Sequence, residues 1–517
     1  PKGDQAIAMV GMDIYTVAVP QVGATAPTVS VANPANATVP VKKLNDVGGE
    51  FPTWTSDGRH VMWSLANALW TYDLDRAKVV EDSLKADAKV KAAAKRDSIA
   101  AAAKRDSAAA PGAAPAPVAA APRPDSAAKA DSAKNKPGYK PVEQRIVVSA
   151  TRDQPRGSVL LRGGRAITMK GNEIIDNADV LVKDNRIVAI GARGAVQVPA
   201  DAKVIDVSGK TVMPGFVDTH YHPQWLIPSI HTNQVWQYLA ELAYGTTTTR
   251  DPQTASTDFL SYADRVETGE VVGPRIYTTG PGVFINENVR DLDHARTILK
   301  RYAQYYDTKT LKMYMTGNRQ QRQWIIMAAK ELGLMPTTEG GLDFKLNITH
   351  GLDGYPGIEH TLPITPKFDD VFQWYKGTQV TNSPTLIVEY GGPFGEGWFY
   401  QSENLAGDAK LKHFTHPEDF DSKIRRRGTG NAPGPAGFAL KEEYAMWQHA
   451  EDVAKTVAAG GRIGVGSHGQ LQGLGMHWEI WLLQSGGLSQ HDALRAATIV
   501  GAQAIGLDTD IGSLEAG

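Results

Sequence analysis

The second half of the chain alternates short strand-like segments with helix-length stretches, and this pattern constrains the fold more than any other feature. From Gly215 onward, eight segments of β-branched and apolar residues end in polar side chains. They are FVDTHYH, GTTTTRD, RIYTTG, TLKMYMTG, LMPTTEG, GIEHT, SPTLIVEY and GRIGVGSH. Repeated strand–helix units favour a parallel sheet with helical crossovers. Eight of them predict an α/β fold in which residues 215–517 form a (β/α)8 barrel of the TIM type.

Polar residues at the ends of these segments are the candidates for a functional site, because such barrels carry their active sites at the carboxyl ends of the strands. The first segment ends with His220 and His222, which are two residues apart and therefore point to the same side of an extended strand. Two neutral imidazoles in that arrangement can bind one cation. The pair predicts a divalent-metal site at the mouth of the barrel.

Composition limits the other kinds of chemistry. The 517 residues include no cysteine, which excludes disulfides, thiolate ligands and a cysteine nucleophile, so any metal is bound by nitrogen and oxygen. A formal net charge of -2 gives no overall field that would attract nucleic acid or an anionic membrane. No apolar run approaches the roughly 18 residues of a membrane span. The small net charge fits a small or neutral substrate. Phosphate-binding loops at strand–helix junctions and serine nucleophile motifs are absent from the sequence, which argues against nucleotide chemistry and serine hydrolysis.

Residues 158–214, just before the barrel, are again rich in strand-like patterns. They contain GSVLLRGGRAITM, ADVLVKDNRIVAIG and KVIDVSGKTVMPG, with turns predicted at Gly163–Gly164, Lys183–Asn185 and Ser208–Gly209. This pattern indicates a small β-sandwich domain. Because the chain starts at Pro1 and its last residues, IGSLEAG, stop in the middle of a pattern, we expect a piece of a longer protein in which C-terminal sandwich strands are missing.

The front of the chain contains short β segments interrupted by a low-complexity stretch. In residues 1–82, FPTWTSDGRHVMWS joins an aromatic strand, a Ser-Asp-Gly turn and a second strand, and it resembles the repeat of TolB-like β-propellers. An incomplete propeller segment is therefore predicted, with an unrelated β meander as the alternative. Residues 83–137 are predicted to be a disordered insertion, part of which can form a solvated helix. Strand-like sequence resumes in residues 138–157, predicted to be a last propeller-like strand and a linker.

The sequence from ADVLVKDNRIVAIG through GKTVMPGFVDTHYHP resembles the entry into the barrel of the amidohydrolase superfamily, on its imidazolonepropionase-like branch. The final IGSLEAG resembles the phrase with which that family leaves the barrel. The resemblance covers about residues 158–517. It implies a metal-dependent hydrolase that cleaves a C–N bond of an amide, peptide-like or cyclic amide substrate.

The same resemblance implies a set of metal ligands. Family members hold one or two divalent metals with the paired histidines, here His220 and His222, and with a fourth-strand lysine that is often carboxylated. Lys312 in LKMYM fits that lysine, with an ordinary lysine at a strand end as the alternative. His360 in GIEHT fits the sixth-strand ligand. Zn²⁺ is the expected metal, as one or two ions, with Mn²⁺ and Fe²⁺ as alternatives.

Two positions depart from the family pattern. Glu339 stands at the end of the fifth segment, where the family has histidine, and His468 stands in GVGSHG, where the family has aspartate. Together the two departures exchange one carboxylate for one imidazole, so the summed ligand charge is unchanged. We therefore expect a compensated site in which Glu339 and His468 are both ligands. The alternative is a degraded site that binds one metal or none.

The expected chemistry follows from the metal. A divalent cation lowers the pKa of bound water toward about 7 and polarises a substrate carbonyl, and a nearby base then moves a proton to the leaving group. The family uses its eighth-strand aspartate as that base. Here both Glu339 and His468 are candidates, and Glu339 is favoured because a metal-bound histidine is a poor base.

About fifty residues between the seventh segment and the next predicted helix are rich in glycine and aromatic residues. Loops of that length are usually functional lids or disordered. Side chains from this loop and the fourth segment are candidates to wall a substrate pocket, or equally to pack on one another: Tyr314, Phe394, Trp398, Phe399 and Tyr400. Arg425–Arg427 are expected to be a solvated charge run, with contact to a substrate carboxylate as the alternative.

The sequence leaves two rival functions open. The same metal site can attack an ester, lactone or phosphotriester, and a barrel with a degraded site can serve as a scaffold or binding protein. Propeller-fused relatives are commonly exported, which favours a periplasmic or extracellular location. A small-molecule or short peptide-like substrate, no nucleic acid partner, no membrane span and a homo-oligomeric assembly complete the expectations.

Overall fold

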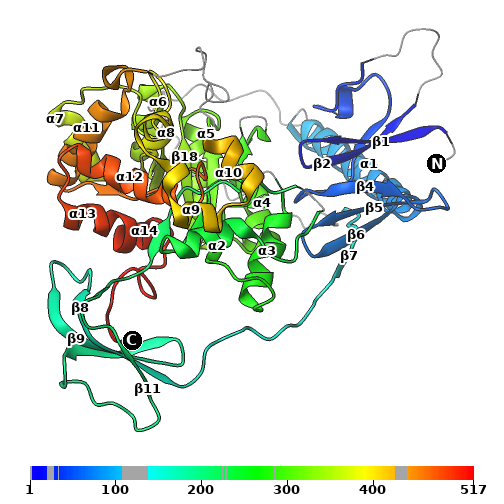
Figure 1. Cartoon of the computed structure of the whole chain (residues 1–517). Coiled ribbons are helices and arrows are strands. Elements are labelled where there is room, and N and C mark those ends of the chain that lie inside the picture. The colour runs from blue at the N-terminus through cyan, green and yellow to red at the C-terminus, as the bar shows by residue number, and fades with distance from the viewer. Residues whose placement is uncertain are drawn as a thin grey trace. The chain divides into compact units, whose positions relative to one another are not determined.

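The computed structural model describes residues 3–19, 28–32, 34–106, 138–223, 225–227, 230–254, 256–284, 287–424 and 439–517. The chain forms two compact units, Pro1–Val147 and Val148–Gly517 (Figure 1). Among the described residues, no helix is both long enough and apolar enough to cross a membrane.

The first unit contains two small antiparallel sheets. One has the order β1-β2-β3 and the other β4-β5-β6-β7. Their strands are β1 (Gln5–Val10), β2 (Asp13–Ala18), β3 (Val41–Lys43), β4 (Glu50–Trp54), β5 (His60–Leu65), β6 (Ala68–Asp73) and β7 (Val142–Arg145). Buried Ile14, Val61, Trp63 and Tyr72 pack together between them. Two sheets of this size do not make a closed propeller, so the TolB-like propeller stays a prediction.

A long helix, α1 (Leu74–Asp106), begins as soon as β6 ends. The sequence segment assigned above to β structure up to residue 82 is therefore helical from Leu74 onward. The run from Leu74 to Asp106 contains no glycine or proline and is rich in alanine and lysine, which favour helix. Residues 107–137, the remainder of the predicted insertion, lie outside the described residues, and β7 then pairs with β6 beyond them.

The second unit opens with a five-stranded sheet over the predicted sandwich region. Its order is β10-β9-β8-β11, and β12 also pairs with β8. The strands are β8 (Ser158–Ile167), β9 (Ile174–Lys183), β10 (Arg186–Ala192), β11 (Lys203–Asp206) and β12 (Thr211–Val212). The end of the chain returns to this sheet, since the Leu514 amide donates to the Thr168 carbonyl at 2.8 Å and the Leu514 side chain packs on Ala166 and Ala178.

One predicted turn in this sheet is wrong. Gly163–Gly164 lies inside β8, where the pairing with β9 shifts register, and Gly163 has a φ of 81°. A glycine pair that accommodates a bulge looks in sequence like a glycine pair that makes a turn. The turns at Lys183–Asn185 and Ser208–Gly209 do join successive strands.

Parallel strands and helices make up the rest of the second unit. Two parallel sheets have the orders β13-β14-β15 and β16-β17-β18-β19-β20-β21. The strands are β13 (Phe216–Asp218), β14 (Thr246–Asp251), β15 (Arg275–Thr278), β16 (Val283–Phe284), β17 (Thr310–Tyr314), β18 (Met335–Glu339), β19 (Gly357–Glu359), β20 (Thr381–Ser383) and β21 (Arg462–Ile463). A parallel bridge between Asp218 and Val465 links the two sheets. The strands alternate with helices as the sequence predicts, which gives a mixed α/β fold consistent with a barrel.

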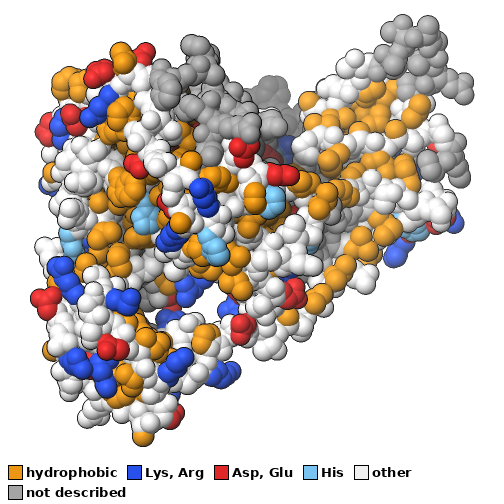
Figure 2. Space-filling view, viewed as in Figure 1, with side chains coloured by type: hydrophobic (Ala, Val, Ile, Leu, Met, Phe, Trp, Pro, Cys, Tyr) orange, Lys and Arg blue, Asp and Glu red, His pale blue; other side chains and the backbone are white. Residues whose placement is uncertain are grey.

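Helices follow most of these strands. The α-helices of this unit are α2 (Trp236–Ala243), α3 (Asp258–Glu267), α4 (Leu292–Lys300), α5 (Arg319–Leu332), α6 (Phe344–Asp353), α7 (Asp369–Thr378), α8 (Glu396–Ser402), α9 (Ala409–Phe414), α10 (Pro417–Ile424), α11 (Met446–Ala458), α12 (Leu474–Ser485), α13 (Gln490–Arg495) and α14 (Gly501–Ala504). The largest core cluster joins α8, α11 and α12 around Trp478 and Leu483. Acidic and basic side chains are interspersed over the visible face of this unit, as expected from the small net charge (Figure 2).

The seventh predicted strand is displaced. The structure has β20 over Thr381–Ser383, and Leu386–Val388 forms a 3-10 helix where a continuous strand up to Tyr390 was expected. Proline at position 384 has no N–H to donate to a strand ladder. The backbone amides of Leu386 and Ile387 donate instead to the buried carboxylate of Glu479.

Candidate metal centre

Four histidine side chains converge at the carboxyl ends of three strands. His220 and His222 follow β13, His360 follows β19, and His468 lies beyond β21. The centroid of the His220 ring lies 4.9 Å from that of His222, 4.8 Å from that of His360 and 5.0 Å from that of His468. The His468 centroid lies 4.8 Å from that of His222 and 5.4 Å from that of His360. The four rings therefore form a single compact cluster.

The backbone adopts unfavourable conformations to bring these rings together. His360 has a φ of 63° and His468 a φ of 58°, in the left-handed region that residues with a side chain rarely occupy. The His468 amide donates to the His220 carbonyl at 2.6 Å. Gly466 packs so tightly on His220 that an added Cβ would overlap the Cβ of that histidine. Strained backbone of this kind is typical of functional sites.

Buried carboxylates orient the first two rings. His220 Nδ1 lies 2.7 Å from Glu359 Oε2, and His222 Nδ1 lies 2.9 Å from Asp251 Oδ1. The Nε2 atoms of the two histidines face each other at 3.1 Å. Glu359 is itself fixed by Arg250, which donates to Oε1 at 2.5 Å. A carboxylate on one ring nitrogen sets the orientation of a metal-binding histidine and leaves the other nitrogen for the metal.

The other two rings have neutral partners on the same nitrogen. Thr385 Oγ1 lies 2.6 Å from His360 Nδ1, and the Gln470 side-chain amide lies 3.1 Å from His468 Nδ1. All four Nδ1 atoms thus contact a polar group outside the cluster. The Nε2 atoms are the ones left to meet at its centre.

Electrostatics keep the buried imidazoles neutral. Burial lowers the pKa of His220 and of His468 well below the usual value, and the neighbouring histidines lower both further. Burial also lowers the pKa of His360, to about 4. Neutral imidazole is the form that binds a metal ion, so these three side chains are ready to act as ligands near pH 7.

Lys312 and Glu339 form an ion pair beside the cluster. Lys312 Nζ lies 2.6 Å from Glu339 Oε2, and the lysine side chain is only 2% exposed. Glu339 Oε2 also lies 3.7 Å from His360 Nε2. Burial by itself would raise the pKa of Glu339, but Lys312 and His360 outweigh burial and hold that pKa below its usual range. Tyr314 is the register partner of Glu339 on the adjacent strand.

The donor set fits a divalent transition-metal ion. One nitrogen from each of His220, His360 and His468 lies within 4.8 Å of the others, and His222 Nε2 adjoins His220. Imidazole nitrogens suit zinc, copper, nickel and iron, so a cluster of neutral imidazoles can bind such an ion without thiolate ligands. The amidohydrolase superfamily suggested by the sequence generally binds divalent metals, and the geometry agrees with that property.

Sequence reasoning found the ligand candidates but missed the side chains that orient them. His220, His222, His360 and His468 come together, and Lys312 and Glu339 lie beside them. Asp251, the last residue of the predicted segment GTTTTRD, contacts His222. Residues not singled out are Glu359, Arg250, Thr385 and Gln470. The signal available for Glu359 was its place next to His360 in GIEHT, since a carboxylate is rarely buried without a partner.

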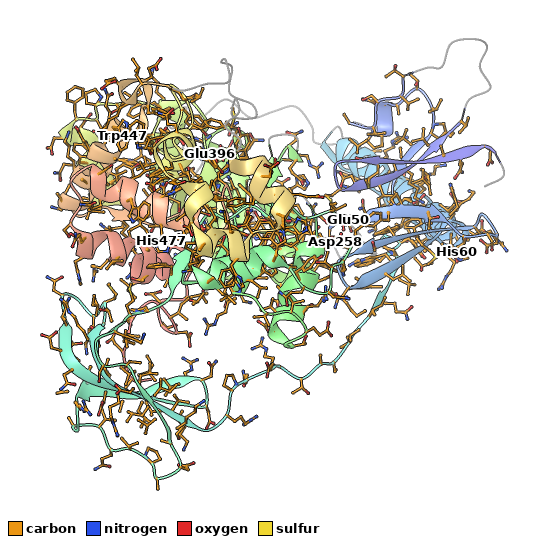
Figure 3. The ribbon with its side chains drawn as sticks, viewed as in Figure 1. Glu50, His60, Asp258, Glu396, Trp447 and His477 are labelled. Carbon is orange, nitrogen blue, oxygen red and sulfur yellow. The ribbon has the colours of Figure 1, made fainter. Side chains whose placement is uncertain are left out.

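The aromatic residues proposed as pocket walls mostly pack elsewhere. Trp398, Phe399 and Tyr400 lie on α8, whose start is marked by Glu396 in Figure 3. The Phe399 ring stacks on Trp478 with centroids 4.8 Å apart, and Trp398 meets Trp447, also labelled in Figure 3, at 5.6 Å. Phe399 is buried in the core with α11 and α12, and Trp398 and Tyr400 are half-buried against that core, on a helix that forms where a loop was expected.

The remaining candidates around the pocket are placed differently. Phe394 is half-buried just before α8, and Tyr314 is half-buried at the end of β17. Arg425–Arg427 lie outside the described residues. A residue not predicted, Tyr390, lies beside the cluster instead, with its ring centroid 5.7 Å from that of His360.

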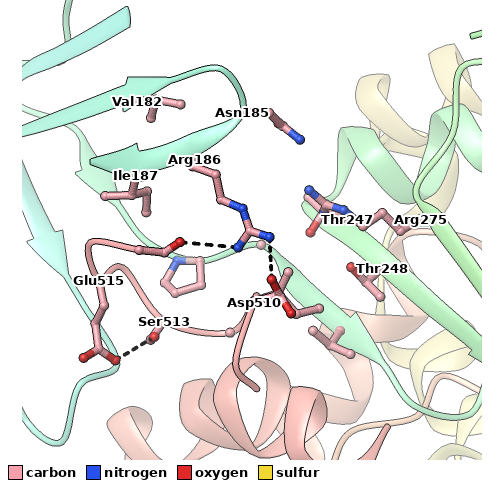
Figure 4. A pocket seen from close by; sticks show the side chains of 16 residues that line it. Val182, Asn185, Arg186, Ile187, Thr247, Thr248, Arg275, Asp510, Ser513 and Glu515 are labelled. Carbon is pink, nitrogen blue, oxygen red and sulfur yellow. Dashed lines mark hydrogen bonds and ion pairs between the residues drawn. The ribbon is translucent and has the colours of Figure 1, made fainter. Parts of the chain in front are cut away.

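A separate cavity of about 270 Å³ lies at the opposite ends of the strands (Figure 4). Its lining includes Gly215 before β13, Thr247 near the start of β14 and Arg275 at the start of β15. Arg186, at its wall, pairs with Asp510 at 2.5 Å. Because the histidines lie at the carboxyl ends of the same strands, this cavity is distinct from the metal centre.

Comparison with known proteins gives sequence relatives with related chemistry. No family model matches the chain. Imidazolonepropionase of Symbiobacterium thermophilum is 24% identical over 403 residues, which are 69% of this chain and 86% of that protein. Adenine deaminase of Deinococcus deserti is 35% identical over 81 residues, and D-hydantoinase of Streptomyces coelicolor is 46% identical over 65 residues. These two matches cover 14% and 13% of the relatives, and 16% and 12% of this chain.

Solved structures support the fold. A Xaa-Pro dipeptidase with bound methionine matches with a TM-score of 0.50 and 17% identity over 70% of this chain and 92% of its own. Molinate hydrolase matches with a TM-score of 0.50 and 14% identity over 70% of this chain and 87% of its own. The sequence relatives support the amidohydrolase superfamily, and these structures support a fold shared with its members. The relatives are enzymes named for hydrolysis of C–N bonds, as the sequence predicts.

Proposed function

We propose that this chain is a metal-dependent hydrolase that cleaves the C–N bond of an amide, peptide-like or cyclic amide substrate. The observation that carries the proposal is the convergence of four histidines, two buried and two half-buried, with their Nδ1 atoms already engaged. The names of the sequence relatives support the bond class, and the fold comparison supports a (β/α)8 barrel closed around that cluster.

The proposed ligands are His220, His222, His360 and His468. Zn²⁺ is the first candidate ion, because tetrahedral imidazole sites suit it, with Mn²⁺ and Fe²⁺ as alternatives. When bound, such an ion supplies Lewis-acid polarisation of a carbonyl and acidifies a water molecule at neutral pH. The histidines contribute by remaining neutral and by holding fixed orientations, so no reorganisation is needed when the substrate arrives.

Glu339 is the proposed general base. Its carboxylate is ionised near pH 7, because the ammonium group of Lys312 outweighs burial and holds its pKa below the usual range. An ionised Oε1 or Oε2 accepts a proton from the attacking water and returns it to the leaving nitrogen, which needs the proton to depart as an amine. His468, the other candidate, is assigned to metal binding because its ring belongs to the cluster. The general-base role therefore falls to Glu339.

A small-molecule or short peptide-like substrate is proposed to lie against two phenols. Tyr314 is paired in register with Glu339, and Tyr390 lies beside His360. Both hydroxyl groups are protonated at neutral pH, since burial raises the pKa of each tyrosine. Protonated phenols can donate to a substrate carbonyl or carboxylate.

The proposal is tested with a panel of amide, dipeptide and cyclic amide substrates, with chromogenic esters and a phosphotriester as comparison. Turnover of a C–N substrate that disappears on chelation and returns with Zn²⁺ is expected. A His222→Ala variant is expected to lose turnover, while a control variant of the exposed His413, His413→Ala, keeps it. Faster turnover of esters or phosphotriesters than of the C–N substrates would show that the proposed C–N bond class is wrong. Absence of any turnover by folded, metal-loaded protein would favour the scaffold alternative.

An exported location and a homo-oligomeric assembly complete the proposal. The location is supported only by the resemblance to exported, propeller-fused relatives, and cell fractionation tests it. Light scattering of purified protein tests the assembly.

A further inference from the structure

Two features bear on the number of cations that the centre can hold. They are the ion pair of Lys312 with Glu339 and the packing of the four histidines. We propose that the centre binds a single divalent cation through His220, His222, His360 and His468, and that Lys312 stays an unmodified amine that positions Glu339. This inference rests on the proposed function, because it concerns the same metal.

The first line of evidence is the arrangement of the rings. Five distances between ring centroids, from 4.8 to 5.4 Å, connect the four histidines into one group. The rings of His220 and His468 each lie next to all three of the others. A site for two cations would divide its histidines between two points about 3.5–4 Å apart. Rings connected through five of their six possible pairs, with one nitrogen each of His220, His360 and His468 within 4.8 Å of the others, favour a single point.

The second line of evidence is the partner of Lys312. Its Nζ lies 2.6 Å from Glu339 Oε2, and both side chains are buried. Carboxylation joins the nitrogen of a neutral lysine amine to carbon dioxide and releases one proton. The product is an anion, and at this position it would lie against the Glu339 carboxylate. Two buried anions in contact repel each other strongly, whereas an ammonium and a carboxylate attract.

The third line of evidence is the swap of ligand types along the chain. Glu339, which ends β18 two positions beyond Thr337, the register partner of Lys312, supplies the carboxylate that pairs with Lys312, while the imidazole lies at position 468. The carboxylate at position 339 is therefore engaged by Lys312, and the proposed metal ligands are all imidazoles. Lys312 acts on the proposed reaction through Glu339, so it is a positioning residue rather than a ligand.

The test is a metal count combined with direct detection of a carbamate. The full chain is reconstituted with excess Zn²⁺ and ¹³C-bicarbonate, freed of unbound ions by gel filtration, and measured by elemental analysis and ¹³C NMR. One equivalent of zinc without a carbamate resonance is expected. Two equivalents with a carbamate resonance would overturn this inference and leave the proposed function intact. No zinc in folded protein would overturn both.

Variants of the ion pair provide the matched comparison. Lys312→Met keeps the side-chain length and removes the amine, and it is expected to retain one equivalent of zinc with reduced kcat. If Lys312 were a carboxylated ligand, this variant would lose zinc. Because Lys312→Met leaves Glu339 buried without its partner, the double variant Lys312→Met/Glu339→Gln serves as a second test that removes both charges. It too is expected to bind one equivalent, and a loss of zinc by this folded variant would contradict the inference.

Discussion

Replacing Glu359 by glutamine tests how the structure prepares the metal centre. Glu359 is 2% exposed and accepts from Arg250 and Thr337 on one oxygen, while its other oxygen lies 2.7 Å from His220 Nδ1. Glu359→Gln keeps the shape but removes the charge and one acceptor. His220 then loses its carboxylate partner, and losing such a partner weakens metal binding by about 10- to 100-fold. That factor corresponds to about 1.4–2.7 kcal/mol.

The same substitution removes the charge that pairs with Arg250. Arg250 is 2% exposed, so its guanidinium would be left in the interior with two neutral acceptors among the described residues, the Thr219 carbonyl and the glutamine oxygen. Breaking a buried ion pair costs about 3–5 kcal/mol, and the remaining acceptors favour the lower end of that range.

Two assays separate these effects. Zinc affinity is measured by competition with a chelator of known affinity, and unfolding is followed in denaturant with and without zinc. A control variant of the exposed Asp293, Asp293→Asn, also breaks a contact with an arginine, but at the surface, and no change in zinc affinity is expected. Unchanged zinc affinity in Glu359→Gln would refute the argument that the carboxylate prepares His220.

Three further predictions follow from other buried groups. Burial lowers the pKa of His350 to about 4, so the unfolded chain binds a proton between pH 6.5 and 4 that the folded chain does not. Stability is therefore lost as the pH falls through that window, by on the order of 3 kcal/mol, and the pH dependence of chemical unfolding should flatten in His350→Phe. Asp452→Ala should cost about 3–5 kcal/mol in denaturant unfolding, because it leaves Lys367 buried without its ion pair; a smaller loss in the double variant Lys367→Met/Asp452→Leu is expected, and equal losses would contradict this reason. Gly466→Ala should displace His220 and weaken zinc binding in a chelator competition, whereas equal affinity would show that the close contact is not needed.

The sequence predicts the ligand candidates because they follow local rules. His220 and His222 alternate with Tyr221 on an extended segment, and His360 and His468 end segments of similar pattern. Parallel strands bring their carboxyl ends to one edge, so residues far apart in the chain could be assigned to the same place. The alternation of strands and helices was also predictable, because it too follows local sequence patterns.

The partners of those histidines could not be predicted in the same way. Glu359 contacts His220 across 139 positions and Arg250 across 109, and no local pattern specifies such a pairing. The displaced seventh strand depends on Glu479, which lies 93 positions from Leu386 and accepts its amide proton. The packing of Phe399 and Tyr400 on Trp478 could not be predicted either, because it depends on a helix that forms only in its tertiary setting.

The most direct test of the central claim is a crystal structure of the zinc-loaded protein with anomalous data at the zinc edge. One anomalous peak is expected between the four rings, about 2.0–2.1 Å from imidazole nitrogens of His220, His222, His360 and His468. A peak bound elsewhere, or no peak in protein shown to be loaded, would contradict the metal centre itself. Two peaks bridged by a modified Lys312 would contradict the single-cation site.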